Sequence, residues 1–220
     1  MIKLSEVKKN PQVLEFIKQT EKTLEVSGYT EHSLEHANLV AGRGREIAKE
    51  IGLSEKEQEL VAIAGFCHDM GNFMTRDYHN YLTALLFHQL FKDSFSPEEI
   101  SIIMQAISNH DREEMSFSNP VAAVLVLADK SDVRRSRVLD EDMEDIRADI
   151  HDRVNYATQE SNIKVDKKAK RITLTLRIDS KFVPIMEYFE IFTDRMVYCR
   201  KAAKYLGYQF GLVINKFKLL

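Results

Sequence analysis

The sequence has little of what marks several large classes of protein. It contains only two cysteines, Cys67 and Cys199, so a small fold held together by several disulfides is excluded. No uninterrupted apolar stretch approaches the length needed to span a bilayer, and the Lys-rich start, MIKLSEVKKN, lacks the apolar core of a signal peptide. We therefore expect a cytoplasmic protein with reduced thiols and no membrane contact.

A strong charge of either sign is also absent. The formal net charge is -3, which gives no polybasic field, so neither a nucleic-acid polymer nor an anionic membrane is expected as a partner. An anionic substrate must then be bound by local groups. The length of 220 residues suits one domain with a full core, or one domain plus a small appendage.

Most of the chain has helical periodicity. Apolar residues recur at helical spacing until about residue 160, and Ser54 and Ser96 each begin a capping box with a Glu three residues later. Asn119-Pro120 is a further start signal. The acidic segment 140–159 keeps apolar residues three and four apart, so we interpret it as an amphipathic helix with a solvated face rather than as a metal or partner site. The predicted helices cover residues 31–51, 55–67, 78–91, 97–109, 120–129 and 140–159.

The period changes after residue 160. Segments 163–165 and 171–178 alternate apolar with polar residues around a turn, which predicts a hairpin. A long helix is expected over 182–206, followed by a third strand at 212–214. The predicted fold is therefore mostly α: a helical domain over residues 1–160, and a small α+β extension over 161–220, with about three strands and one long helix, packed on it.

Two apolar runs end in residues that bind metals. Segment 61–67 ends at His68-Asp69, and segment 121–128 ends at Asp129. Ionisable groups are costly to hold beside apolar helices unless something binds them. Imidazole nitrogens and carboxylate oxygens are ligands that several divalent metals accept. We therefore interpret His36, His68, Asp69 and Asp129 as one metal site.

Simpler explanations exist for each of these residues. His68-Asp69 could be a chance pair that caps a helix, and Asp129 could form a buried salt bridge to Arg134 or Arg135. A third possibility is an all-α core whose histidines are coincidental.

The order of these residues resembles the HD superfamily of metal-dependent phosphohydrolases. The segment Cys67-His68-Asp69-Met70-Gly71 is similar to the signature of that family, and Ala128-Asp129-Lys130-Ser131-Asp132 is similar to its closing Asp segment. The segment that starts at His36 fits its first helix, whereas a frame that starts at His32 does not. The resemblance covers about residues 30–137. It implies a helical bundle, a bound divalent metal and hydrolysis of a phosphoester, with His36, His68, Asp69 and Asp129 as ligands.

The resemblance also suggests roles for further histidines. In relatives with two ions, extra histidines come from between the His-Asp pair and the final Asp, where this chain has His79 and His110. These two are expected to be second-metal or phosphate ligands. His88 lies on the opposite helix face from His79, and His151 is expected on the surface.

One departure from the family concerns phosphate binding. Many relatives have Lys or Arg shortly after the His-Asp segment, where this chain has Asn72. Arg76, Lys130 and Arg135 are the candidates to bind phosphate oxygens instead. The Glu-Asp pair of some nucleotide-hydrolysing relatives is not recognisable, so no general acid is assigned.

The leading hypothesis is therefore a phosphohydrolase, a phosphomonoesterase or phosphodiesterase, for a small molecule such as a nucleotide. One or two divalent ions would activate water, with His68, Asp69 and Lys130 as catalytic residues and His32 orienting His36. Manganese, iron, magnesium, cobalt, nickel and zinc all suit the ligand set. The alternative is a catalytically silent metal- or nucleotide-binding sensor or scaffold, in which the C-terminal extension serves dimerisation or partner binding. The sequence leaves a homodimer open.

Overall fold

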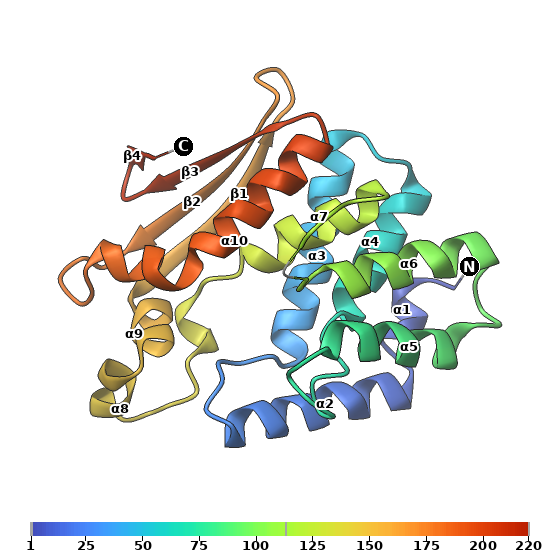
Figure 1. Cartoon of the computed structure of the whole chain (residues 1–220), viewed down its shortest axis with the longest axis horizontal. Helices are drawn as coiled ribbons and strands as arrows, with labels where there is room; N and C mark the ends of the chain where they lie inside the picture. The colour runs from blue at the N-terminus through green and yellow to red at the C-terminus, as the bar shows by residue number, and fades with distance from the viewer. Residues whose placement is uncertain (1, 113, 220) are drawn as a thin grey trace.

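Helices build the first two thirds of the chain. The computed structural model describes residues 2–112 and 114–219, and Figure 1 shows the helical part with α2 along one side and the sheet at the other. The helices before the sheet are α1 (Leu4–Val7), α2 (Pro11–Val26), α3 (Leu34–Ile51), α4 (Glu55–Cys67), α5 (His79–Phe91), α6 (Pro97–Asn109), α7 (Pro120–Lys130), the short 3-10 helix η1 (Arg135–Arg137), α8 (Met143–Ala148) and α9 (Ile150–Ala157).

Helix starts follow the capping residues. Ser54 and Ser96 both form complete capping boxes with Glu57 and Glu99, so α4 and α6 begin where the sequence predicts. Helix α3 begins three residues later than predicted. The Ser33 hydroxyl accepts a hydrogen bond from the backbone of Glu35 at 3.0 Å, and this cap stops the helix from extending back to residue 31.

The acidic segment forms two helices rather than one. The Asp149 carboxylate accepts hydrogen bonds from the backbone N–H groups of His151 at 2.7 Å and Asp152 at 3.0 Å. Asp149 therefore ends α8 in extended backbone and caps the start of α9. The prediction of one helix over 140–159 was wrong for this reason.

Helix α7 occupies the centre of the core. Every residue from Val121 to Lys130 is buried, and α7 contacts α3, α4, α6 and α10 (Ile185–Tyr205). Helices α3 and α4 approach each other closely at Gly65, where an added Cβ would lie only 3.1 Å from the backbone nitrogen of Ala41. Helices α3, α4 and α7 carry the candidate ligands His36, His68 and Asp129 at or near their ends.

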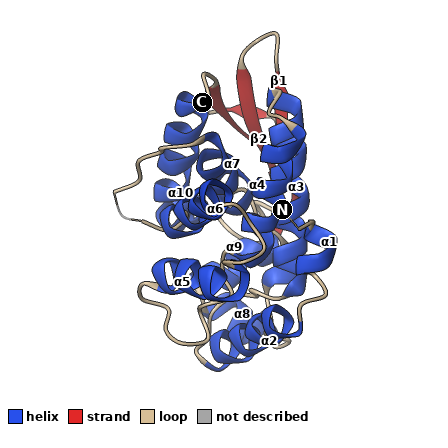
Figure 2. Cartoon of the chain, turned by 90° about the vertical axis from the view of Figure 1, so that its right-hand side faces the viewer, coloured by secondary structure: helices blue, strands red, loops and turns tan. Residues whose placement is uncertain are grey.

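The C-terminal part is a mixed sheet with one long helix. The strands β1 (Thr158–Asp166), β2 (Arg171–Ile178), β3 (Gln209–Ile214) and β4 (Phe217–Lys218) lie in the order β1-β2-β3-β4. Strands β1 and β2 form the predicted hairpin, and β3 runs parallel to β2 because α10 crosses between them. Figure 2 shows the sheet at one end of the molecule with α10 beside it. The fourth strand adds to the three that the sequence predicts.

The core is continuous through both parts. Buried side chains of α7, such as Val124, belong to the same apolar cluster as Phe192 of α10 and Leu174 of β2. The division of the chain at residue 160 stays a prediction. Among the residues that the structure describes, no helix combines the length and apolar character needed to cross a membrane.

Candidate metal centre

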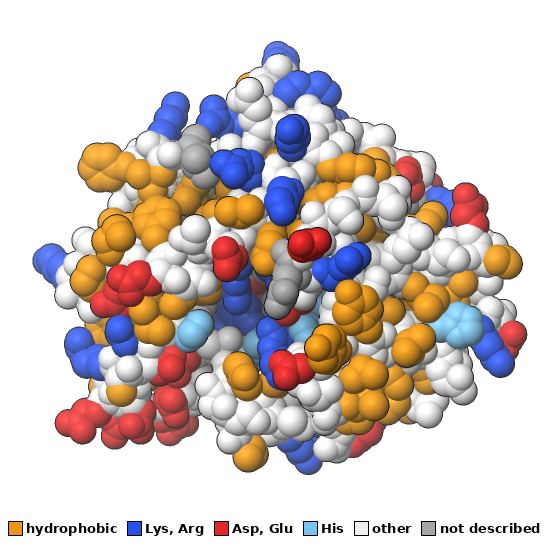
Figure 3. All heavy atoms as spheres, in the orientation of Figure 1, with side chains coloured by type: hydrophobic (Ala, Val, Ile, Leu, Met, Phe, Trp, Pro, Cys, Tyr) orange, Lys and Arg blue, Asp and Glu red, His pale blue; other side chains and the backbone are white. Residues whose placement is uncertain are grey.

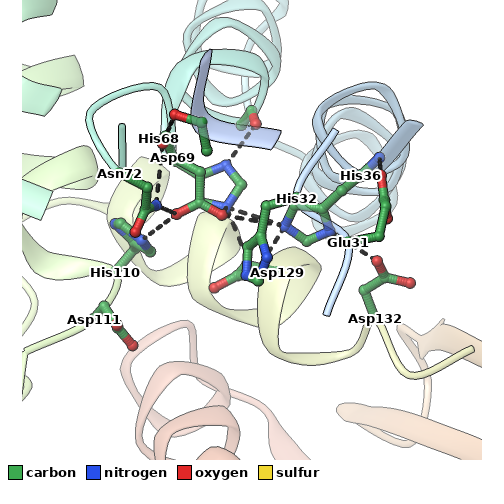
Figure 4. Close-up of polar contacts among 12 residues, drawn as sticks. Glu31, His32, His36, His68, Asp69, Asn72, His110, Asp111, Asp129 and Asp132 are labelled. Carbon is green, nitrogen blue, oxygen red and sulfur yellow. Dashed lines mark hydrogen bonds and ion pairs between the residues drawn. The ribbon is translucent and has the colours of Figure 1, made fainter. Parts of the chain in front are cut away.

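Four imidazoles and two carboxylates meet at the ends of five helices. His36 lies in α3, His68 follows α4, His79 begins α5, and His110 follows α6. Asp69 is next to His68, and Asp129 is near the end of α7. Figure 4 shows several of these side chains turned toward one another. All four histidines are buried.

Each of the four rings has one nitrogen engaged away from the cluster. The Nδ1 atoms of His68, His79 and His110 lie 2.8, 2.8 and 2.6 Å from the carbonyl oxygens of Gly65, Arg76 and Ile107. Since a carbonyl oxygen only accepts, each Nδ1 carries a hydrogen and donates it. Each acceptor belongs to the residue three positions earlier. In a neutral ring, the Nε2 atom therefore presents a lone pair to the cluster.

The fourth ring is held by a carboxylate. The Nδ1 atom of His36 donates to Asp132 Oδ2 at 2.7 Å, and Asp132 is fully buried. Burial raises the pKa of Asp132, but the hydrogen bond from His36 and the charge of Arg137 outweigh it and lower that pKa below its ordinary value. Asp132 is thus ionised and increases the basicity of the His36 Nε2 atom.

The inward-facing atoms form two sets. The first ligand set is His36 Nε2, His68 Nε2, Asp69 Oδ2 and Asp129 Oδ1, whose atoms lie 3.2–3.6 Å apart in the pairs that touch. The second ligand set is Asp69 Oδ1, His79 Nε2 and His110 Nε2, which lie 3.2–3.4 Å apart. Asp69 belongs to both sets, with one oxygen in each.

These spacings fit a metal ion in each set. Metal–ligand bonds of about 2.1 Å place neighbouring ligand atoms roughly 3.0 Å apart in an octahedral shell and roughly 3.4 Å apart in a tetrahedral one. In three groups of side chains, the ligand atoms lie within 4.8 Å of one another, which is close enough to hold one ion. The groups are His36-His68-Asp69, His68-His110-Asp129 and Asp69-His79-His110. The donor atoms, nitrogen and oxygen without sulfur, suit several divalent metals.

The electrostatics of the first set also favour a cation. Burial lowers the pKa of His68, but the carboxylates of Asp69 and Asp129 outweigh burial and raise that pKa to about 10. Burial raises the pKa of Asp69, and the neighbouring His68 and His110 bring it well below its ordinary value. The carboxylates of Asp69 and Asp129 are thus stabilised by a positive charge beside them. A divalent ion would supply that charge in place of the proton on His68.

A second layer of side chains fixes Asp69. The Asn72 amide donates to Asp69 Oδ1 at 3.0 Å, and its carbonyl oxygen accepts from Arg76 at 3.0 Å. Asn72 therefore connects the Asp69 carboxylate to a basic residue. Arg76 also lies 3.4 Å from Asp111 Oδ2.

Lys130 stands between two carboxylates at the edge of the site. Its Nζ atom lies 3.0 Å from Asp129 Oδ2 and 2.8 Å from Asp111 Oδ1. Burial lowers the pKa of Lys130, but the charges of Asp129 and Asp111 raise it above its ordinary value. Lys130 is therefore a fixed positive charge beside the first ligand set.

Two residues that the sequence assigned to the site make other contacts in the structure. The exposed Arg135 donates to the Tyr156 carbonyl oxygen at 2.7 Å and stacks on the Tyr156 ring, so its proposed phosphate contact is not supported. The hydrogen-bond partner of His36 Nδ1 is Asp132 rather than His32, whose ring lies edge-on to the His36 ring with centroids 5.6 Å apart. His32 Nε2 instead accepts a hydrogen bond from Arg137 at 3.2 Å.

The sequence reasoning missed four residues of the site. Asp132 lies in the closing segment already singled out, and Asp111 directly follows His110. Both could have been found from their positions. Arg137, in η1, and Arg195, in α10, lie outside the segments that the sequence singled out for the metal site. Arg195 lines the same cavity as Asp69, His110 and Asp129.

The site lies in a hollow of the molecular surface. Figure 3 shows basic, acidic and histidine side chains gathered around a depression near the middle of this face. A wider cleft, lined by residues 76–81 and Asp111 among others, adjoins the second ligand set at His79. The site is thus open to small molecules from that side.

The comparisons with known proteins agree with this picture. The HD domain family model matches residues 29–156, a span that contains every member of both ligand sets and that ends before the sheet and α10. No curated protein matches the chain.

Proposed function

The chain belongs to the HD domain family, and from this membership and its site we propose that it is a metal-dependent phosphohydrolase acting on a phosphoester of a small molecule, with a nucleotide as the expected substrate. One observation carries the proposal. Four buried imidazoles each turn an Nε2 atom toward two carboxylates, while every Nδ1 is occupied outside the cluster. Without a metal ion, such lone pairs and two carboxylates would oppose one another in a buried space unless an imidazole such as His68 takes up a proton.

The residues divide the task of holding metal. His36, His68 and Asp129 would hold one ion, His79 and His110 a second, and Asp69 would share its two oxygens between them. Divalent ions in such a site polarise a phosphoryl oxygen and acidify a water molecule.

The remaining polar residues would bind and orient the substrate. Lys130 and Arg76 both reach Asp111 at the mouth of the site, so both can exchange that carboxylate for a phosphate oxygen. Asn72 would keep the two oxygens of Asp69 directed at the two ligand sets. Asp132 fixes the ring of His36.

The test combines metal analysis with turnover. The purified protein should contain divalent metal and release inorganic phosphate from members of a nucleotide panel. The variant Asp69→Asn should lose both properties, whereas His88→Ala, a change at an exposed position on α5, should keep them. Protein without metal after purification and metal reconstitution would contradict the proposal. Bound metal without phosphate release would instead favour the silent sensor or scaffold.

A further inference from the structure

Arg195 differs from the other cations around the metal centre. Lys130 is paired with Asp111 and Asp129, Arg76 with Asp111, and Arg137 with Asp132. Within residues 2–112 and 114–219, the structure gives the Arg195 guanidinium no hydrogen bond and no ion pair. Its one partner there is the ring of Phe192, which lies 4.3 Å from the guanidinium carbon.

The position of Arg195 brings this charge to the metal centre. It projects from α10, which packs on α7, and it lines a cavity together with Asp69, His110, Asp129 and Lys130. Figure 4 shows the faint red ribbon of α10 passing below Asp111 and α7. Arg195 therefore reaches the cavity of the ligand sets from α10, the helix that packs on α7.

Arg195 is half-buried, and keeping its charge partly away from water costs free energy. Burial lowers the pKa of Arg195 below its ordinary value, and the like charge of Arg137 adds to this effect. The carboxylates of Asp129 and Asp111 act in the other direction, but both already bind Lys130. An anion in the cavity would offset this cost, and the planar guanidinium is suited to two oxygens of one phosphate.

The size of the cavity limits what enters it. The cavity beside Arg195 has a volume of about 20 Å³, whereas the adjoining cleft has about 680 Å³. Pockets that hold a whole small ligand have roughly 300–1,000 Å³. The inner cavity is thus far too small for a whole ligand and can admit only a small terminal group of one, whereas the cleft, which includes Tyr78 and Tyr81, has the size expected for the organic part. A phosphodiester would need room for an organic group on both sides.

We propose that Arg195 binds the terminal phosphate of a phosphomonoester and thereby makes the C-terminal helix α10 part of the substrate site. This inference rests on the proposed function, since it assigns the phosphate of that substrate to this cavity. Arg195 would contact the phosphate both before and during hydrolysis, so its loss should raise KM more than it lowers kcat.

The experiment compares Arg195→Gln, Arg195→Lys and a matched control. Arg200→Gln changes an exposed arginine on the same helix, outside the cavity. Manganese-loaded proteins are assayed with p-nitrophenyl phosphate and with bis(p-nitrophenyl) phosphate. Arg195→Gln should raise KM for the monoester roughly 10- to 100-fold, the loss expected for one charge-assisted hydrogen-bonding group. The KM of Arg195→Lys for the monoester should lie between those of the wild type and Arg195→Gln, and the KM of Arg200→Gln should equal that of the wild type. The metal content should be the same in all four proteins.

Titration calorimetry with inorganic phosphate separates this inference from the proposed function. If the wild type hydrolyses neither ester and releases no phosphate from the nucleotide panel, the proposed function fails. Weaker phosphate binding by Arg195→Gln would still support the anion site. Equal phosphate affinity in wild type and Arg195→Gln, or no binding by either, overturns the inference. Faster hydrolysis of the diester than of the monoester overturns it as well.

Discussion

The Nδ1 atom of His36 and the Oδ2 atom of Asp132 lie 2.7 Å apart in the core, where neither side chain is open to solvent. This contact joins α3 to the segment that follows α7. It fixes which nitrogen of His36 faces the first ligand set. The family signature contains the histidine, but the orientation of its ring depends on this carboxylate.

Replacement of Asp132 should weaken metal binding without removing a ligand. Asp132→Asn keeps the shape but not the charge, so the His36 Nε2 atom becomes less basic. We expect metal affinity to fall roughly 10- to 100-fold, as for other partners of metal-binding histidines. Metal affinity is measured by competition with a chelator, and circular dichroism checks that the variant folds. Asp93→Asn, at an exposed position, is the control. Unchanged affinity in Asp132→Asn would contradict the role assigned to this contact.

The second ligand set should account for one of two ions. His110→Ala removes one of its two imidazoles, so the metal content should fall from about two ions per chain to about one. Elemental analysis of protein dialysed against dilute metal measures this ratio. His88→Ala should leave it unchanged. A wild type that binds a single ion, or a variant that still binds two, would argue against the second set.

The lack of a side chain at Gly65 should be required for the close approach of α3 and α4. Its added Cβ would lie 3.1–3.2 Å from backbone atoms of Val40 and Ala41, and backbone cannot move aside easily. We expect Gly65→Ala to destabilise the protein by about 1–3 kcal/mol, measured by urea unfolding.

Gly42 provides the matched control on α3. It is exposed, and nothing lies within 4 Å of an added Cβ there. Gly42→Ala should therefore stabilise the protein by up to about 1 kcal/mol, as Ala does in an open helix position. Equal effects of the two substitutions would show that the close approach at Gly65 has no energetic importance.

The two cysteines should resist alkylation in the folded protein. Burial raises the pKa of the Cys199 thiol to about 12 and that of Cys67 above its ordinary range. An unfolded thiol has a pKa of about 8.5, so at pH 8 thiolate forms readily only after unfolding. Mass spectrometry after iodoacetamide treatment at pH 8 should show no label without urea and two labels with it. Rapid labelling of native protein would contradict the buried positions.

Asp152 should make stability depend on pH in the acidic range. Burial, and then the neighbouring Asp149 and Asp140, raise the pKa of Asp152 to about 6, above the unfolded value of about 3.9. The folded state therefore holds this proton more tightly. The resulting stabilisation is fully present below about pH 4 and is lost as pH rises through 6.

The variant Asp152→Asn isolates this effect. It cannot ionise, so its melting temperature should exceed that of the wild type at pH 8 and approach it at pH 4. The corresponding difference in unfolding free energy should be about 1 kcal/mol or less, because the repelling carboxylates of Asp149 and Asp140 are exposed to solvent. A variant that is less stable than the wild type at pH 8 would contradict the repulsion. His151→Ala, next to it on an exposed face, is the control.

The sequence predicted best what depends on local chemistry. Ser54 and Ser96 begin helices through capping boxes that need only nearby residues, and the alternation over 171–178 predicted β2 correctly. The predicted family and the mostly helical fold with a small C-terminal sheet are confirmed. The break at Asp149 was missed because a single capping side chain interrupted an otherwise regular apolar pattern.

The surroundings of the candidate ligands were harder to predict than the ligands. Arg135 and His32 were chosen by their distance along the chain, but Arg135 turns toward Tyr156, and Arg137 occupies the His32 ring nitrogen. Arg195 is far from the signature in sequence. Only the packing of α10 on α7 brings it to the cavity, and no periodicity or motif encodes that contact.

The order of these elements along the chain has a consequence during protein synthesis. Helices α3 to α7, with both ligand sets, leave the ribosome before α10 does, because translation proceeds from the N-terminal side. Both ligand sets are thus synthesised while the Arg195 wall of the cavity is still missing. That wall is added only when α10 packs on α7 and completes the shared core.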